Sequence, residues 1–173
     1  MYTMKVYLIG YMGSGKSSAG KLLAEKMKVD FLDFDRYIEN ETGKTIAEIF
    51  DTEGEEKFRE LENQYLKKIL NKENTVVSLG GGTPCFHNNI ELINKSGKSV
   101  YLDMDVESLV KRLFKARNKR PLIRGLNETE LKYFIEANLE KRKAVYEQAH
   151  FTVNASGLSV EEVSEEIRKK IKA

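Results

Sequence analysis

The segment from Gly10 to Ser17 reads GYMGSGKS and matches the pattern G-x-x-x-x-G-K-[S/T] at every fixed position. A short apolar run precedes it at residues 5–9, and a stretch with helical spacing follows it at residues 16–27. The pattern requires this strand–loop–helix context, because backbone N–H groups of the loop and the N-terminus of the helix together hold phosphate oxygens. The segment therefore predicts a phosphate-binding loop.

The side chains of this loop have predicted roles in binding a nucleotide. Lys16 is expected to reach the β- and γ-phosphates of ATP, and the Ser17 hydroxyl is expected to bind Mg²⁺. The other residues of the loop expected to bind the nucleotide are Gly13, Ser14, Gly15 and Ser18. A guanine nucleotide is disfavoured, because the nearest candidate for an Asn-Lys-x-Asp element, residues 118–120, is followed by Pro121.

The composition argues against several other classes of protein. A chain of 173 residues is expected to form one domain, covering residues 1–173. Its 29 basic and 27 acidic residues give a net charge of +2, which supplies no overall electrostatic reason to bind nucleic acid. The chain has one cysteine, Cys85, and no apolar run approaches the roughly 18 residues of a membrane span. We therefore expect a cytoplasmic protein with neither a nucleic-acid nor a membrane partner.

Short apolar runs alternate with longer charged segments along the chain. The runs are expected to be strands and lie at residues 5–9, 31–34, 75–79, 99–102 and 151–153. The segments between them have helical periodicity, and Thr45 and Ser159 each begin the Ser/Thr-x-x-Glu pattern of a capping box. This alternation predicts an α/β fold with a parallel sheet.

One interval, residues 111–124, breaks the alternation. It holds seven basic residues and no acidic residue, and the stretch ARNKRPLIRG, residues 116–125, contains a proline and a glycine in place of a helical face. We expect a mobile loop there. The alternative is a solvated charged surface, which is the usual environment of a run of charges.

Asp33 and Asp35 lie two residues apart at the end of the second expected strand. Alternate residues of a strand share a face, and ligands of open α/β sheets gather at the carboxyl ends of the strands. Both carboxylates are therefore expected to face the phosphate-binding loop, with Asp33 in the Mg²⁺ shell through water and Asp35 beside an acceptor hydroxyl. The alternative for Asp35 is the N-cap of a helix that begins with RYIENE.

Seven segments of the chain, in order, resemble those of the shikimate kinase family. They are GYMGSGKSS, DFDRYIE, TGKTIAEIF, GEEKFRELE, SLGGGTP, RPLI and EKRKAVYEQAH, and they extend from Gly10 to His150. The resemblance implies a three-layer α/β sandwich with a five-stranded parallel sheet of order 2-3-1-4-5 and a mobile lid at about residues 112–126. It also implies transfer of the ATP γ-phosphoryl group to the 3-hydroxyl of shikimate, with Mg²⁺, in chorismate and aromatic amino acid biosynthesis, by a monomer.

On the acceptor side, the resemblance assigns roles to residues that follow the second, third and fourth strands. Asp35 would contact the hydroxyls of shikimate, and Arg59 and Arg142 would hold its carboxylate, for which a planar guanidinium is the matching partner. The ring of shikimate would lie against Gly80, Gly81 and Gly82, at positions where a side chain would collide with it. The substrate-binding helices would cover about residues 35–62.

On the nucleotide side, Arg120 would be the lid arginine on the phosphates, and Arg112 would stack near the adenine, close to the loop at residues 154–157. Catalysis would be performed by Lys16, Asp35 and Arg120, mostly by positioning and charge neutralisation.

Alternatives to these roles stay open. Arg59 and Arg142 lie in charged helical segments, where an exposed ion pair is the ordinary expectation, and the three glycines also fit a flexible turn. For the whole chain, one alternative is another small-metabolite P-loop kinase, such as a gluconate kinase. The other is a nucleotide-dependent binding module without catalytic activity, against which the low net charge argues.

Lys16 provides the first test. We expect Lys16→Ala to abolish phosphoryl transfer and to leave the fold intact, because the loop directs this side chain toward phosphate oxygens rather than into a core. Turnover and far-UV circular dichroism of the variant measure the two effects. A kcat close to that of the wild type would remove the kinase interpretation.

Overall fold

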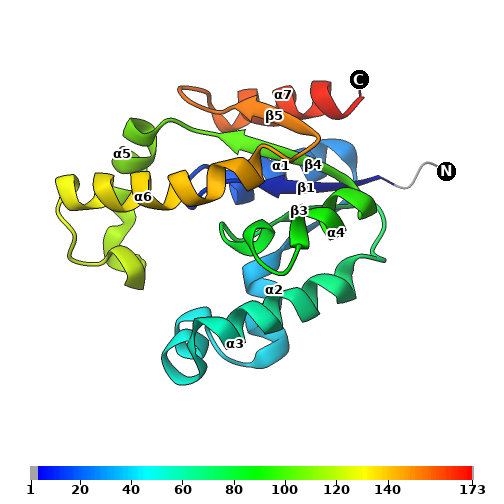
Figure 1. The fold of residues 1–173 in the computed structure, drawn as a ribbon. Coiled ribbons are helices and arrows are strands. Elements are labelled where there is room, and N and C mark those ends of the chain that lie inside the picture. The colour runs from blue at the N-terminus through cyan, green and yellow to red at the C-terminus, as the bar shows by residue number, and fades with distance from the viewer. Residues whose placement is uncertain (1–3, 173) are drawn as a thin grey trace.

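Five strands form one parallel sheet, of order β2-β3-β1-β4-β5, in a computed structural model that describes residues 4–172 (Figure 1). This is the order that the resemblance implied. The strands are β1 (Lys5–Ile9), β2 (Asp30–Asp33), β3 (Thr75–Ser78), β4 (Lys98–Asp103) and β5 (Phe151–Asn154). The register pairs Val6 of β1 with Val76 of β3 on one side and with Lys98 of β4 on the other.

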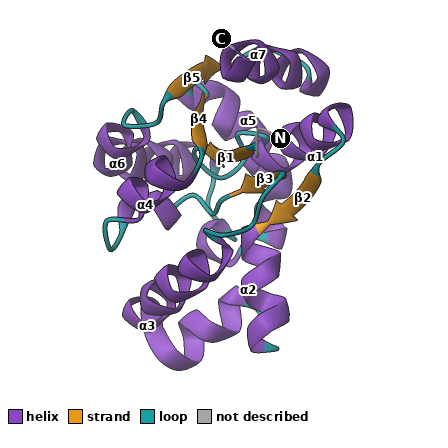
Figure 2. Cartoon of the chain, turned by 90° about the vertical axis from the view of Figure 1, so that its right-hand side faces the viewer, coloured by secondary structure: helices purple, strands orange, loops and turns teal. Residues whose placement is uncertain are grey.

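Helices cover both faces of the sheet and extend beyond its end. They are α1 (Lys16–Met27), α2 (Phe34–Thr42), α3 (Ile46–Ile69), α4 (Asn89–Ser96), α5 (Val106–Ala116), α6 (Glu128–Tyr146) and α7 (Val160–Lys172). Viewed along the sheet, α1 and α7 lie on one side, and α4 and α6 lie on the other (Figure 2). In both views α2 and α3 project together from the rest of the protein. No helix within residues 4–172 combines the length and the apolar composition needed to cross a membrane.

The central strand β1 is buried along its whole length. Tyr7, Leu8 and Ile9 have no exposed surface, as expected for a parallel strand that is covered on both faces. Helix α1 packs directly on this region through Gly20, where a Cβ atom would lie 2.9 Å from side-chain carbons of both Leu8 and Phe31. The core therefore fixes α1, and with it the loop that precedes α1.

Three chain segments leave the same edge of the sheet because β1, β2 and β3 are parallel and adjacent. Strand β1 leads into the phosphate-binding loop, β2 into the start of α2, and β3 into the three glycines at residues 80–82. The carboxyl ends of adjacent parallel strands are the usual ligand site of open α/β sheets. The topology therefore brings all three segments together.

The second strand ends one residue earlier than expected, at Asp33 rather than Phe34. Asp33 is the N-cap of α2, because its Oδ1 accepts a hydrogen bond from the Arg36 backbone N–H at 3.3 Å. The N-cap role considered for Asp35 was therefore wrong, and so was the argument that Asp33 and Asp35 share a strand face. Asp35 lies in the first turn of α2.

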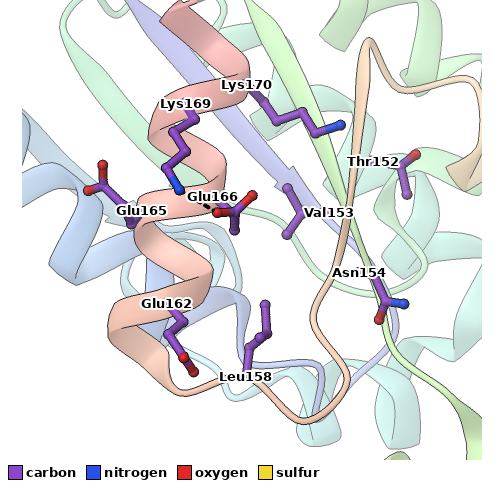
Figure 3. Close-up of a pocket in the computed structure, with 9 residues that line it drawn as sticks. All are labelled: Thr152, Val153, Asn154, Leu158, Glu162, Glu165, Glu166, Lys169 and Lys170. Atoms are coloured by element: carbon purple, nitrogen blue, oxygen red, sulfur yellow. Dashed lines mark hydrogen bonds and ion pairs between the residues drawn. The ribbon is translucent and has the colours of Figure 1, made fainter.

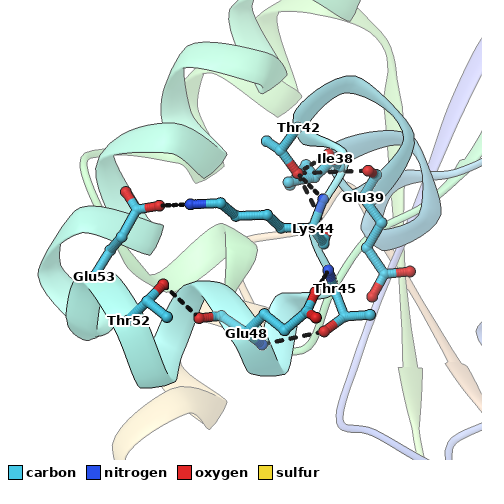
Figure 4. A network of polar contacts seen from close by, with 8 residues as sticks. All are labelled: Ile38, Glu39, Thr42, Lys44, Thr45, Glu48, Thr52 and Glu53. Carbon is cyan, nitrogen blue, oxygen red and sulfur yellow. Dashed lines mark hydrogen bonds and ion pairs between the residues drawn. The ribbon is translucent and has the colours of Figure 1, made fainter.

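The junction between α2 and α3 is held by a local network of polar contacts (Figure 4). The predicted capping box is confirmed: the Glu48 backbone N–H donates to Thr45 Oγ1 at 3.1 Å, and the Thr45 backbone N–H donates to Glu48 Oε2 at 2.7 Å. Lys44 pairs with Glu53 at 2.7 Å. Gly54, with φ 83° and ψ 169°, then interrupts the helical backbone of α3, a conformation that is essentially restricted to glycine. The predicted capping box at Ser159 and Glu162 is also confirmed.

The capping box predicts how much Thr45 contributes to stability. Thr45→Ala removes the acceptor for the Glu48 backbone N–H and should lower the free energy of unfolding by about 1 kcal/mol. Urea denaturation of the wild type and the variant measures this difference. Thr52→Ala is the matched control, because the Thr52 hydroxyl only donates to the Glu48 carbonyl inside the helix, and it should change stability by no more than about 0.5 kcal/mol. Equal losses in the two variants would contradict the capping role.

Candidate active site

The phosphate-binding loop turns sharply at Gly15, the residue before α1. Gly15 has a φ of 88°, in the left-handed region that suits glycine. At Gly10, a Cβ atom would lie 2.8 Å from the Leu102 carbonyl oxygen, so the loop runs directly against β4. The Ser14 hydroxyl is buried and has no hydrogen-bond partner among the described residues. An unpaired buried hydroxyl is costly, and it leaves the loop with a donor for a bound anion.

Lys16 is a buried cation with only 8% of its surface exposed. Its Nζ donates to two carbonyl oxygens of its own loop, those of Gly10 at 2.7 Å and Tyr11 at 2.9 Å. Burial lowers the pKa of Lys16 to about 8, although the nearby Asp35 carboxylate opposes this shift. No carboxylate hydrogen-bonds to Lys16 within the described chain, so the positive charge is available to an anionic ligand.

Three side chains with oxygen atoms, from three segments of the chain, meet beside Lys16. The Ser17 hydroxyl donates to Asp33 Oδ2 at 3.1 Å and lies 3.0 Å from the Ser78 hydroxyl. Hydroxyl and carboxylate oxygens suit Mg²⁺, which keeps several water or phosphate ligands when it binds at a nucleotide. Residues 4–172 contain no group of three or more His, Cys, Asp or Glu side chains that could hold a metal ion. This donor set therefore fits Mg²⁺ bound together with phosphate, and not a cage made by protein alone.

Two adjoining cavities open at this edge of the sheet. The first, of about 380 Å³, is lined by the phosphate-binding loop, Asp33 and Ser78. The second, of about 530 Å³, is lined by α2, α3, the three glycines, α6 and the lid. Both are lined by Met12, Asp35, Gly80, Gly81 and Arg120. The two cavities therefore adjoin at these five residues.

Asp35 stands at the junction of the two cavities. Its Oδ1 occupies the space beside Gly80, where a Cβ atom would lie only 2.7 Å from it. Burial raises the pKa of Asp35 to about 6, and the Glu62 and Asp33 carboxylates contribute to the increase. A carboxylate with a pKa closer to neutrality is a better proton acceptor than an ordinary aspartate. Asp35 is therefore suited to contact a hydroxyl placed between the cavities.

Arg59 lies in the wall of the larger cavity and is 8% exposed. Its Nη1 donates to Glu62 Oε1 at 2.9 Å, and its Nη2 is 3.4 Å from Glu55 Oε1. The expected alternative of an exposed helical ion pair is wrong for this residue, because both Arg59 and Glu62 are buried. Sequence reasoning did not single out Glu62; the signal for it was its position three residues after Arg59, on the same helix face.

Arg142 reaches the same cavity from α6. Its Cζ lies 5.8 Å from the centre of the Tyr11 ring, in the phosphate-binding loop. The cavity thus has Arg59 and Arg142 in addition to Arg120, and an apolar side that includes Phe50 and Phe58. These two phenylalanines were also not identified from the sequence, because helical phenylalanines ordinarily indicate core packing.

The lid closes the other side of the larger cavity. After α5 it forms two short 3₁₀ turns, Arg117–Lys119 and Pro121–Ile123. Arg117 Nη1 donates to the Phe114 carbonyl at 2.7 Å, and Arg124 Nη2 donates to the Asn118 carbonyl at 3.2 Å. Within residues 4–172, no hydrogen bond or ion pair holds the Arg120 side chain, which lines both cavities.

Each of the three glycines leaves room for a side chain of the protein itself. A Cβ atom would lie 2.7 Å from Asp35 Oδ1 at Gly80, and 2.6 Å from Arg59 Nη1 and Nη2 at Gly82. At Gly81 it would be 3.4 Å from Arg142 Nη1. A side chain at Gly80 or Gly82 would therefore displace Asp35 or Arg59, which is a different reason for glycine from the one considered from the sequence, whereas the separation at Gly81 is an ordinary van der Waals contact.

Arg112 lies beside the phosphate-binding loop, where its Nη1 donates to the Gly13 carbonyl at 3.4 Å. Another groove, of about 690 Å³, lies between β5 and α7 and includes Asn154 (Figure 3). Its charged side chains come from α7, and Lys169 pairs there with Glu166 at 2.7 Å. None of the residues that line it belongs to the phosphate-binding loop. The structure therefore places Arg112, but not this groove, next to the phosphate side.

Comparison with known proteins identifies relatives over almost the whole chain. The family model described as "Shikimate kinase" matches residues 12–172. A protein named shikimate kinase from Azobacteroides pseudotrichonymphae is 45% identical over 168 residues, which cover 96% of this chain and 99% of the relative. A crystal structure of shikimate kinase from Bacteroides thetaiotaomicron has a TM-score of 0.93 at 39% identity and covers 99% of both chains. A shikimate kinase from Acinetobacter baumannii, solved in complex with shikimate, has a TM-score of 0.90 at 33% identity and covers 99% of this chain and 94% of that one.

Proposed function

The chain belongs to the shikimate kinase family, and on this premise we propose which of its residues transfer the ATP γ-phosphoryl group to the 3-hydroxyl of shikimate. The observation that carries the proposal is the junction of the two cavities at Asp35 and Arg120. One cavity has the loop that holds phosphates, and the other has two arginines suited to a carboxylate. A phosphate donor and an anionic acceptor therefore meet where a carboxylate and a lid arginine converge.

On the nucleotide side, ATP would be held by the backbone of the phosphate-binding loop and by Lys16, and Mg²⁺ by Ser17 with Asp33 through water. When bound, ATP supplies the phosphoryl group and Mg²⁺ offsets part of its negative charge. The 3.1 Å contact between Ser17 and Asp33 supports this assignment. The buried Lys16 and the lid Arg120 add positive charge around the transferred group, and Arg112 lies where it can border the nucleotide.

On the acceptor side, Arg59 and Arg142 would bind the carboxylate of shikimate. A guanidinium offers parallel N–H donors that match the two oxygens of a carboxylate. The apolar wall at Phe50 and Phe58 suits the carbon skeleton of a six-membered ring. The Acinetobacter relative, which was solved with shikimate bound, supports the choice of this acceptor.

Asp35 would orient the attacking hydroxyl and receive its proton. Its raised pKa favours proton acceptance. Most of the rate enhancement then comes from holding two anions in line and from neutralising charge, which Lys16 and Arg120 can provide without forming a covalent bond.

The two alternatives considered from the sequence differ from this function in a direct assay. A gluconate kinase would release ADP only with gluconate, and a binding module would bind ATP with no acceptor-dependent turnover. Family membership favours shikimate. ADP release measured with shikimate, gluconate and a nucleoside monophosphate separates the three. The monomeric state and the cytoplasmic location expected from the sequence stay predictions.

The lid assignment predicts a large catalytic effect of Arg120. Arg120→Ala should lower kcat by up to about 10³, the scale found for arginines that stabilise a transferring phosphoryl group, and ATP affinity should fall less. Steady-state kinetics and ATP titration measure the two effects. Arg124→Ala is the matched control, because Arg124 bonds within the lid, and it should retain most of the activity. Comparable losses in both variants would mean that the lid responds only to total charge.

The acceptor assignment predicts a selective effect of Arg59. Arg59→Lys keeps the charge but loses the planar fork, and the loss of a charge-assisted hydrogen bond, roughly 1.5–3 kcal/mol, lowers kcat/KM for shikimate about 10- to 150-fold. ATP affinity should stay unchanged, and the loss should shrink with an analogue whose carboxylate is replaced by a neutral group.

Arg168→Lys is the control for this substitution, since Arg168 forms an ordinary helical ion pair with Glu165 at 3.5 Å on α7. It should leave the kinetics unchanged. If Arg59→Lys also kept KM and kcat for shikimate within twofold of the wild type, the carboxylate assignment would be wrong.

A further inference from the structure

The segment after the three glycines contains two side chains that do not line the acceptor cavity, Thr83 and Phe86. Thr83 contacts Glu62, the ion-pair partner of Arg59, and Phe86 contacts Arg59 itself. We propose that Thr83 and Phe86 are positioning residues, which fix the Arg59 guanidinium in the orientation that binds the acceptor carboxylate. The inference rests on the proposed function of Arg59.

The first contact is polar and passes through Glu62. Thr83 Oγ1 donates to Glu62 Oε2 at 2.7 Å, and Glu62 Oε1 accepts from Arg59 Nη1 at 2.9 Å. Thr83 has no exposed surface, Glu62 has 1%, and Arg59 has 8%. Because each Glu62 oxygen has its own donor, the carboxylate cannot rotate without breaking a buried hydrogen bond. Thr83 therefore determines how Glu62 faces Arg59.

Thr83 is itself anchored on both sides. The Asn89 amide donates to the Thr83 carbonyl at 2.8 Å, and the Asn63 amide of α3 donates to Asn89 Oδ1 at 2.7 Å. The Thr83 backbone N–H donates to the Gly80 carbonyl at 3.1 Å. The network thus runs from Asn63 on α3 through Asn89 on α4 to Thr83, and it returns to α3 at Glu62. Such a closed network holds the Thr83 hydroxyl in a fixed position relative to Arg59.

The second contact is aromatic and acts on the face of the guanidinium. The centre of the Phe86 ring lies 4.2 Å from Arg59 Cζ, closer than the rings of Phe58 at 5.1 Å and Phe50 at 6.0 Å. A ring at this distance attracts the cation and restricts the tilt of its plane. At Gly82 the guanidinium occupies the space that a Cβ atom would fill, 2.6 Å from Nη1 and Nη2. The Arg59 Nε has no partner among the described residues.

The orientation of Arg59 matters because a guanidinium forms two parallel hydrogen bonds with a carboxylate only when the two planar groups are aligned. A displacement of about 1 Å can cost on the order of 10²-fold in rate when groups must meet in a set geometry. Thr83 and Phe86 do not line the cavity, so their substitution changes no direct contact with the acceptor. A selective effect on shikimate must then pass through residues that do line the cavity, and a double-mutant cycle with Arg59 tests whether it passes through that residue rather than through Gly80.

The test compares Thr83→Val, which removes the hydroxyl and keeps the shape, with Thr83→Ser, which keeps the hydroxyl. Thr83→Val should raise the shikimate KM roughly tenfold, the lower end of the effect of one hydrogen bond to a charged group. Thr83→Ser should restore a KM near that of the wild type, and the KM for ATP should stay within twofold in both. Thr75→Val is the matched control, because Thr75 is also buried but its hydroxyl donates only to the Glu73 carbonyl.

Phe86→Leu tests the second contact independently, should Thr83→Val fail to fold by circular dichroism. It should raise the shikimate KM severalfold and leave the KM for ATP unchanged. The decisive measurement is a double-mutant cycle with Arg59→Lys. If Thr83 and Phe86 act through Arg59, each substitution should change the shikimate KM less than twofold in the Arg59→Lys background.

Three results would overturn the inference: a shikimate KM within twofold of the wild type in both Thr83→Val and Phe86→Leu, an equal rise in the KM for ATP, or full additivity with Arg59→Lys. A different result overturns the role proposed for Arg59 itself, namely that Arg59→Lys alone leaves the kinetics for shikimate unchanged. The two failures are therefore distinguishable.

Discussion

The active site depends on cations that are held out of water. Lys16 and Arg59 are each 8% exposed, and one lies on each side of Asp35. A buried charge is tolerated only when nearby groups compensate for its lost hydration. Loop carbonyls do this for Lys16, and Glu62 does it for Arg59. Both residues line a cavity, and the packing of α1 on the sheet and of α3 against residues 80–83 keeps these cations in place.

Much of the fold followed from local patterns. The phosphate-binding loop, the helix at residues 16–27 and the capping boxes were correct because each depends on residues close together in the chain. The end of β2 was misplaced because Asp33 caps α2, and the sequence FLDFD does not reveal which aspartate takes that position. The order of the strands came from the resemblance to a family, since alternation of strands and helices indicates a parallel sheet but not its order.

The site was harder to derive than the fold, because it depends on contacts between distant segments. The burial of Arg59 and Glu62 cannot be read from GEEKFRELE, which looks like an exposed charged helix. It arises when the glycine segment, some twenty residues later, packs over them. The same contacts explain Gly80 and Gly82, two of the three glycines that had been interpreted as room for a ligand. Thus the structure brings together residues that the sequence singled out, whereas the contacts that hold them appeared only in three dimensions.

The shared wall of the two cavities has a consequence for inhibitor design. Asp35, Gly80, Gly81 and Arg120 border both spaces, so a single small molecule can extend from one to the other. A compound with a carboxylate at one end and a phosphate mimic at the other would occupy both spaces at once. Its two groups would together lose translational freedom only once, whereas two separate compounds would each lose it. Resistance to such a compound would be hard to acquire by enlarging a glycine, because a side chain at Gly80 or Gly82 would displace Asp35 or Arg59.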